Sequence, residues 1–142
     1  MVKLSEFVLY TKKQTEYINI TDRVKKLVEE SGIKDGVVFV ITAHTTSGIT
    51  VNECLECLQS DMEETMCSLV PEDGKYSHAR MLHSYGQTAG NAPGHLRALI
   101  TNNHAVLPVK DGKLYRGKAQ EIFFAEYDGP QDRTVFVEVM GI

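Results

Sequence analysis

The sequence has few cysteines and no long hydrophobic run, and each shortage excludes a class of protein. Three cysteines among 142 residues are an odd and sparse set, so the disulfide framework of a secreted scaffold is not expected. The longest apolar stretch, residues 37–43, falls far short of the roughly 20 residues that a membrane-spanning helix needs. The N-terminus also lacks a signal-peptide pattern. We therefore expect a cytoplasmic protein with no membrane partner.

An excess of positive charge is also missing. The net charge is −4 and the isoelectric point is near 5.7, so no large positive field attracts a phosphate backbone and no nucleic-acid partner is expected. The 42% hydrophobic and 24% charged residues are typical of a soluble globular protein. A chain of this length can bury a core without disulfides or metal ions. The sequence predicts one folded domain, residues 1–142.

Strand-forming and helical segments alternate along the chain. Apolar residues at helical spacing predict helices near residues 21–31, 55–69 and 91–100. Segments rich in strand formers predict strands at 4–10, 17–20, 36–43, 49–52, 104–109, 114–116, 121–127 and 133–140. We expect the first two strands to form a hairpin. Strand 36–43 is apolar on both alternating sets, which predicts burial of both faces. The order favours an α+β domain with an antiparallel-rich sheet and helices packed on it.

Histidines supply the first indication of chemistry. His44 ends the apolar strand, His78 lies in a long polar segment, and His95 is near the start of the third helix. Three imidazoles can bind zinc and leave a fourth position for water or substrate. Asp61, beside the apolar stripe of the second helix, can orient one such imidazole. The alternatives are surface or capping roles for the histidines and a solvated Asp61, because no local metal-binding motif is present.

Hydroxyl groups and cations suggest an anion site. The turn at residues 45–48 offers Thr46 and Ser47 in a short polar segment that can hold a phosphate. Four cations of the C-terminal third can complete such a site or can be solvated: Lys113, Arg116, Lys118 and Arg133.

The Cys54-x-x-Cys57 spacing occurs in redox pairs and in zinc half-sites. Only Cys67 remains to complete a zinc site, so we expect these cysteines to be small buried packing residues.

Six segments, taken together over nearly the whole chain, resemble the YjbQ-like family, whose members are often described as secondary thiamine-phosphate synthases. The segments are HTTSGITVNE (44–53), DM (61–62), VPEDGKYSH (70–78), NAPGHLRA (91–98), LPVKDGKL (107–114) and QEIF (120–123).

The resemblance implies a β-sandwich-like α+β fold, a homotrimer and a polar pocket able to bind a metal ion. The histidines of the family motifs fall on His44, His78 and His95, and its polar positions fall on Asn52 and Asp61. In a loop where the family usually has Gly-Thr-Trp-Gln, this chain has Gly-Lys-Ala-Gln and retains Gly117 and Gln120. The retained Gln120 is the expected substrate contact of that loop.

The family activity joins a pyrimidine pyrophosphate to a thiazole phosphate and releases pyrophosphate. The leading hypothesis is a metal-dependent enzyme that acts on a small phosphorylated metabolite. The expected metal ligands are His44, His78 and His95, and Asp61 is the carboxylate that assists them. The expected catalytic groups are His44 and Asp61. The expected substrate contacts are Thr46, Ser47, Asn52 and Gln120. Imidazole ligands favour zinc over magnesium. The alternatives are a phosphoester hydrolase and a non-catalytic, trimeric module that binds a metal or a metabolite.

Overall fold

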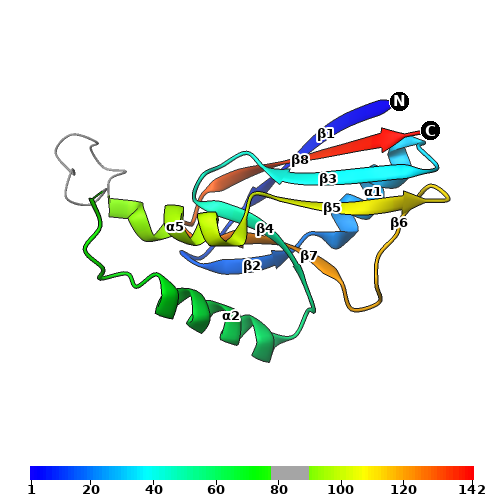
Figure 1. Ribbon diagram of the computed structural model, residues 1–142. Helices are drawn as coiled ribbons and strands as arrows, with labels where there is room; N and C mark the ends of the chain where they lie inside the picture. Colours follow the sequence, from blue (N-terminus) through cyan, green and yellow to red (C-terminus); the bar gives the residue numbers. More distant parts are fainter. Residues whose placement is uncertain (78–89) are drawn as a thin grey trace.

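The computed structural model describes residues 1–77 and 90–142 (Figure 1). The strands are β1 (Val2–Tyr10), β2 (Glu16–Asn19), β3 (Gly36–Thr42), β4 (Ser47–Asn52), β5 (His104–Lys110), β6 (Lys113–Leu114), β7 (Glu121–Glu126) and β8 (Asp132–Gly141). The helices are α1 (Thr21–Ser31), α2 (Glu56–Leu69) and α5 (Ala92–Thr101). His78 lies outside the described residues.

The strands form two antiparallel sheets. The larger sheet has the order β1-β8-β3-β5-β6 and the smaller one the order β2-β7-β4, which confirms the predicted α+β fold. The expected hairpin of the first two strands is wrong, because β1 pairs with β8 and β2 pairs with β7. The polar segment after β1 instead carries the chain from one sheet to the other. Residues 128–130 do the same between β7 and β8. Local patterns identify strands, but they do not identify their partners.

The core lies between the two sheets and is closed by α1. Its members include Val38 and Val40 of β3, Val137 of β8, and Val24 and Val28 of α1, all fully buried. Helix α1 ends at Gly32, whose left-handed backbone (φ 73°) is readily adopted by glycine. The hydrophobic effect thus holds the sheets and α1 together along their facing sides.

The outer face of the larger sheet stays exposed in the described part of the chain. Val38, Val40 and Thr42 of β3 are buried, whereas the alternate residues of that strand are only half-buried. The predicted burial of both faces of this strand is therefore wrong for a single chain. Neighbouring strands add exposed apolar side chains to the same face: Val2, Leu4 and Val8 of β1, Val106 of β5 and Met140 of β8.

Helix α2 packs loosely against the rest of the chain, and none of its residues is buried. Its C-terminal end is held by the buried Arg97 of α5. The Arg97 Nε and Nη2 atoms donate to the Val70 carbonyl at 3.2 and 2.8 Å, and Nη1 donates to Glu72 at 2.9 Å. The second predicted helix is thus confirmed, but its apolar stripe borders a cleft and not the core.

The three cysteines, Cys54, Cys57 and Cys67, are free and exposed. The expectation that they are buried packing residues is wrong, because they lie on or next to the loosely packed α2. None of the described helices is long and apolar enough to cross a bilayer.

Candidate functional site

Two adjoining hollows lie between the β3–β4 turn and the first turn of α5. Their volumes are about 540 and 410 Å³, and His44, Thr45 and His95 line both. His44 directly follows β3, and His95 is the fourth residue of α5, so each ring is carried by a regular element. Of the three histidines predicted to converge, His44 and His95 line the same space, and His78 lies outside the described residues. We call the two hollows together the histidine hollow.

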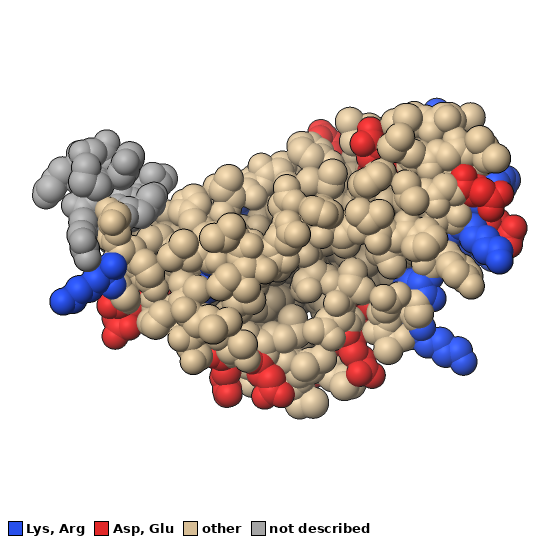
Figure 2. Space-filling view, viewed as in Figure 1, with Lys and Arg blue, Asp and Glu red and all other residues tan. Residues whose placement is uncertain are grey.

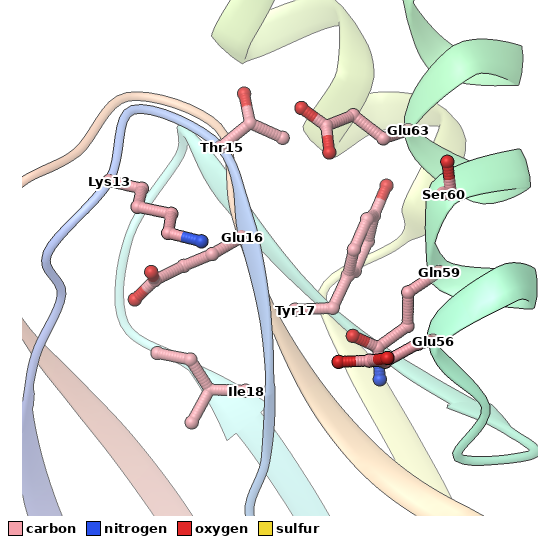
Figure 3. Close-up of a pocket in the computed structure, with 9 residues that line it drawn as sticks. All are labelled: Lys13, Thr15, Glu16, Tyr17, Ile18, Glu56, Gln59, Ser60 and Glu63. Atoms are coloured by element: carbon pink, nitrogen blue, oxygen red, sulfur yellow. The ribbon is translucent and has the colours of Figure 1, made fainter.

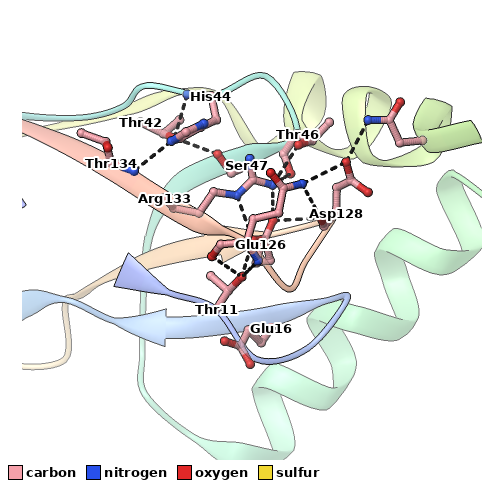
Figure 4. A network of polar contacts seen from close by, with 12 residues as sticks. Thr11, Glu16, Thr42, His44, Thr46, Ser47, Glu126, Asp128, Arg133 and Thr134 are labelled. Carbon is pink, nitrogen blue, oxygen red and sulfur yellow. Dashed lines mark hydrogen bonds and ion pairs between the residues drawn. The ribbon is translucent and has the colours of Figure 1, made fainter. Parts of the chain in front are cut away.

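The His44 ring is fixed by a backbone hydrogen bond. The Thr134 N–H of β8 donates to His44 Nε2 at 2.8 Å (Figure 4). The Ala43 N–H donates to the Thr134 carbonyl at 3.1 Å, so the same residue of β8 also holds the backbone next to His44. A backbone amide can only donate, so Nε2 is an unprotonated acceptor. The neutral imidazole therefore carries its proton on Nδ1.

His44 Nδ1 makes none of the hydrogen bonds in the described part of the chain. This N–H therefore has no acceptor among the described residues, and His44 lines the histidine hollow. Burial lowers the pKa of His44, the positive charge of Arg133 lowers it further, and Glu126 opposes them. Protonation of Nε2 would also point its N–H at the Thr134 N–H, and neither of these groups can accept a hydrogen bond. The ring remains neutral near neutral pH.

A first prediction concerns acid stability. Unfolded histidine binds a proton below about pH 6.5, whereas folded His44 binds it only at lower pH. Below pH 6.5 the unfolded state therefore binds more protons, so the contribution of His44 is present above this pH and is lost as the pH falls through the folded pKa. We expect the free energy of unfolding, measured by urea denaturation, to fall less steeply with decreasing pH in His44→Ala. Parallel curves for both proteins would contradict this.

A buried ion pair holds the β3–β4 turn that borders the histidine hollow. Arg133 of β8 and Glu126 of β7 are 2% and 0% exposed. Arg133 Nε donates to Glu126 Oε1 at 2.8 Å, and Arg133 Nη2 donates to Glu126 Oε2 and, at 2.8 Å, to Thr46 Oγ1. The Thr11 hydroxyl donates to Glu126 Oε1 at 2.7 Å. Arg133 thus fixes the β3–β4 turn (Figure 4), and its charge is neutralised by Glu126.

The sequence interpretation missed Glu126. One signal was present: Glu126 is the single acid in the apolar run from Ile122 to Tyr127. A carboxylate in such a run needs a buried partner.

The start of α5 offers further polar groups to the histidine hollow. Asn91 precedes the helix without a side-chain cap, and no acidic residue lies in the first turn. Asn91 Nδ2 donates to Asp128 Oδ2 at 2.8 Å, whereas the buried Asn91 Oδ1 has no hydrogen-bond partner within residues 1–77 and 90–142. An unsatisfied buried acceptor is costly, so it marks a place for a ligand that donates a hydrogen bond. The positive end of the helix dipole favours an anion here.

Two of the predicted substrate contacts adjoin the histidine hollow. Thr46 and Ser47 line its two parts and are both buried. Thr46 Oγ1 accepts from Arg133, and Ser47 Oγ shares a hydrogen bond of 2.7 Å with Thr42 Oγ1. Both hydroxyls therefore have structural partners as well as access to the hollow.

The other predicted site residues lie elsewhere. Asp61 and Asn52 line a cleft under α2 and are not among the residues that line the histidine hollow. Gln120 belongs to the segment between β6 and β7, at the opposite end of the molecule in Figure 1. Its Oε1 accepts the Gly117 N–H at 2.8 Å. These three residues are not brought to His44.

The donor atoms of the described residues do not form a metal site around His44. Among the described residues, no group of three or more histidine, cysteine or acidic side chains is arranged to hold a metal ion. In the observed orientation His44 has no lone pair to offer, because Nε2 accepts from Thr134 and Nδ1 carries the proton. The His44 ring therefore does not fit the role of a zinc ligand.

Known proteins resemble this chain along its whole length. A model of the family described as "UPF0047 protein YjbQ-like" matches residues 5–142. A UPF0047 protein of Archaeoglobus fulgidus is 41% identical over 135 residues, which cover 95% of this chain and 99% of that protein. Bacillus subtilis YugU is 32% identical over 138 residues, with 97% and 99% covered.

Solved structures share the fold. The crystal structure of a YbjQ-like protein of unknown function from Sulfolobus solfataricus matches with a TM-score of 0.91 at 34% identity, covering 100% of this chain and 99% of that chain. A conserved protein of Clostridium acetobutylicum matches with a TM-score of 0.86 at 36% identity, with 96% and 99% covered.

Proposed function

The chain belongs to the YjbQ-like UPF0047 family, and we propose that it is an enzyme that acts on a small phosphorylated metabolite. The proposed site is the histidine hollow, where His44 and His95, which fall on the motif histidines of the family resemblance, lie together. The observation that carries this proposal is the fixed, neutral ring of His44, with its Nδ1–H available to a ligand. A cytoplasmic location is part of the proposal, because the sparse cysteines are free and exposed.

The polar groups of the histidine hollow suit a phosphoryl group. Phosphate oxygens accept hydrogen bonds, and the hollow offers His44 Nδ1–H and the positive end of α5. The orphaned Asn91 Oδ1 requires a donor, which a substrate hydroxyl or a protonated phosphate oxygen supplies. Arg133 contributes little net charge, since Glu126 neutralises it. Recognition therefore rests on directed hydrogen bonds.

The chemistry that follows is stabilisation of negative charge. A fixed N–H donor stabilises an oxygen that becomes more negative in the transition state, and it needs no rearrangement at that moment. The leaving pyrophosphate of thiamine-phosphate synthesis gains such charge, and so does the leaving oxygen in phosphoester hydrolysis. His95 lies in the same hollow and is the candidate for proton transfer. The proposal covers both reactions and uses no metal ion in any step.

Binding and turnover test the proposal separately. Inorganic phosphate and a phosphomonoester are titrated into ¹⁵N-labelled protein, and the two thiamine precursors and phosphoesters are then screened for turnover. We expect amide shifts at residues 44–47 and at residues 91, 92, 94 and 95, and turnover of a phosphorylated compound. Binding without turnover would instead favour the non-catalytic module. No shift at these residues would reject a phosphate site.

Self-association is a second proposal, carried by a separate observation. The outer face of the larger sheet carries exposed apolar side chains beside Glu6 and Glu138, and both residue sets of β3 are apolar, as in strands covered on both sides. We propose that copies of this chain cover this face in the homotrimer that the family resemblance implies. Val106, 50% exposed, lies beside Phe39 at the centre of the face.

A charge at Val106 tests this assembly. We expect light scattering to give a trimer mass for the wild type and a monomer mass for Val106→Glu, because a buried carboxylate without a partner disrupts an interface. Leu69→Glu is the matched control, because Leu69 is also exposed but is the last residue of α2, outside the larger sheet. A wild-type monomer, or a trimer in Val106→Glu, would contradict the proposal.

A further inference from the structure

A cleft of about 340 Å³ separates the loosely packed α2 from the smaller sheet and α5. Its lining residues come from elements far apart in the sequence: Tyr17 of β2, Leu58, Asp61, Met62 and Met66 of α2, Ile100 and Thr101 of α5, and Tyr127 after β7. An adjoining hollow of about 530 Å³ shares Tyr17 and continues along α2. Figure 3 shows the Tyr17 ring standing between β2 and α2. We call these two spaces the α2 cleft.

A directed chain of hydroxyl groups ends in the α2 cleft. The Thr101 hydroxyl donates its single proton to the Arg97 carbonyl at 2.9 Å. The contact of 2.6 Å between Tyr127 and Thr101 therefore has the Tyr127 hydroxyl as its donor. By the same reasoning, Tyr17 donates to Tyr127 at 3.2 Å. The Tyr17 oxygen then has only lone pairs left, so it is an acceptor for a ligand.

The pKa of Tyr17 agrees with its role as the donor in the hydrogen bond to Tyr127. Burial raises it, and the hydrogen bond to Tyr127 raises it further, so the hydroxyl stays protonated and continues to donate to Tyr127.

The charges along the α2 cleft also favour a ligand that donates hydrogen bonds. Its carboxylates are Glu16, Glu56, Asp61 and Glu63. Of the described residues that line the cleft, only Lys13 carries a positive charge. Figure 2 shows acidic side chains along the lower edge, where α2 lies in Figure 1. The cleft therefore presents acceptors and negative charge together.

An apolar wall limits the chemistry of the occupant. Four apolar side chains border the α2 cleft: Leu58, Met62 and Met66 of α2, and Ile100 of α5. A bare metal ion would leave this wall exposed to water, whereas an organic cation covers it. A cation can also lie against the face of the Tyr17 ring. The occupant that satisfies all of these groups has N–H donors, a positive charge and a short hydrocarbon body.

We propose that the α2 cleft binds a small primary alkylammonium ion, whose N–H groups donate to the Tyr17 oxygen and the Asp61 carboxylate and whose hydrocarbon chain packs against Met62 and Met66. This site is separate from the histidine hollow and goes beyond the proposed activity there. It also gives a role to Asp61, which the sequence associated with the histidines and which lies on α2, where it lines the α2 cleft.

Three probes of one size and different charge test the proposal on the intact protein. Butylammonium, butanol and butyrate are titrated into ¹⁵N-labelled protein, and the shifts of α2 and of residues 17, 101 and 127 are followed. We expect saturable shifts with butylammonium at millimolar concentration and at least about fivefold weaker binding of the other two. Equal binding of butanol, or no shift with butylammonium, would overturn the proposal.

Variants test which residues of the α2 cleft bind butylammonium and whether their negative charge contributes. Asp61→Asn and Glu63→Gln are each expected to weaken butylammonium binding at least about threefold, and Tyr17→Phe to weaken it by removing the acceptor. Glu64→Gln is the matched control, because it removes the same charge from α2 at an exposed residue that does not line the cleft. Unchanged affinity in Asp61→Asn and Tyr17→Phe, or equal weakening in Glu64→Gln, would overturn the assignment.

Discussion

Glu126→Ala is expected to destabilise the fold by about 3–5 kcal/mol, measured as the free energy of unfolding in urea. The substitution leaves the guanidinium of Arg133, 2% exposed, without its counter-charge. It also removes one of the two acceptors of the Thr11 hydroxyl, the other being the Gln131 carbonyl. A buried charge without a partner loses hydration and gains nothing in return, which is why breaking such a pair costs far more than an exposed pair contributes.

The control is a second ion pair of the same residue types. Glu121 lies 3.6 Å from Arg116, and both side chains are partly exposed, at 24% and 18%. Glu121→Ala is expected to cost about 1 kcal/mol or less. A double variant, Glu126→Ala with Arg133→Met, is expected to recover part of the loss, because it removes the uncompensated charge. If Glu126→Ala cost no more than Glu121→Ala, the Glu126–Arg133 pair would not support the histidine hollow.

His44→Ala is expected to lower turnover of a phosphorylated substrate by about 10²–10³-fold, the usual loss when one fixed donor to a developing charge is removed. The loss should fall mainly on kcat, since the Nδ1–H acts most strongly on the charge that develops in the transition state. Initial rates over a range of substrate concentrations separate kcat from KM.

His104→Ala controls for the loss of an imidazole. His104 is exposed on β5 and does not line the histidine hollow. We expect its turnover to equal that of the wild type. If His44→Ala retained full turnover, His44 would have no part in the chemistry and the hollow would need another catalytic group. Circular dichroism of each variant excludes unfolding as the cause of a loss.

The sequence predicted what depends on local periodicity. The three described helices lie where apolar spacing placed them. The strand predicted at 36–43 is observed as β3. These features depend only on neighbouring residues, because the periods of helices and strands are fixed by backbone geometry.

The rest depends on pairings between distant segments. Glu126 meets Arg133 because β7 and β8 belong to different sheets that face each other. Tyr17, Thr101 and Tyr127 form one chain only after three elements are assembled. The fixed tautomer of His44 depends on the backbone amide of Thr134, and an amide leaves no signature in the sequence.

The tautomer of His44 is measured most directly by ¹⁵N NMR of the ring nitrogens in histidine-labelled protein near neutral pH, with His44 assigned by the loss of its signals in His44→Ala. We expect a neutral ring with the proton on Nδ1, and a shift of the Nδ1 signal when a phosphomonoester is added. A proton on Nε2, or coordination of His44 to added zinc, would contradict the hydrogen bond from Thr134 and would favour a metal-dependent enzyme instead.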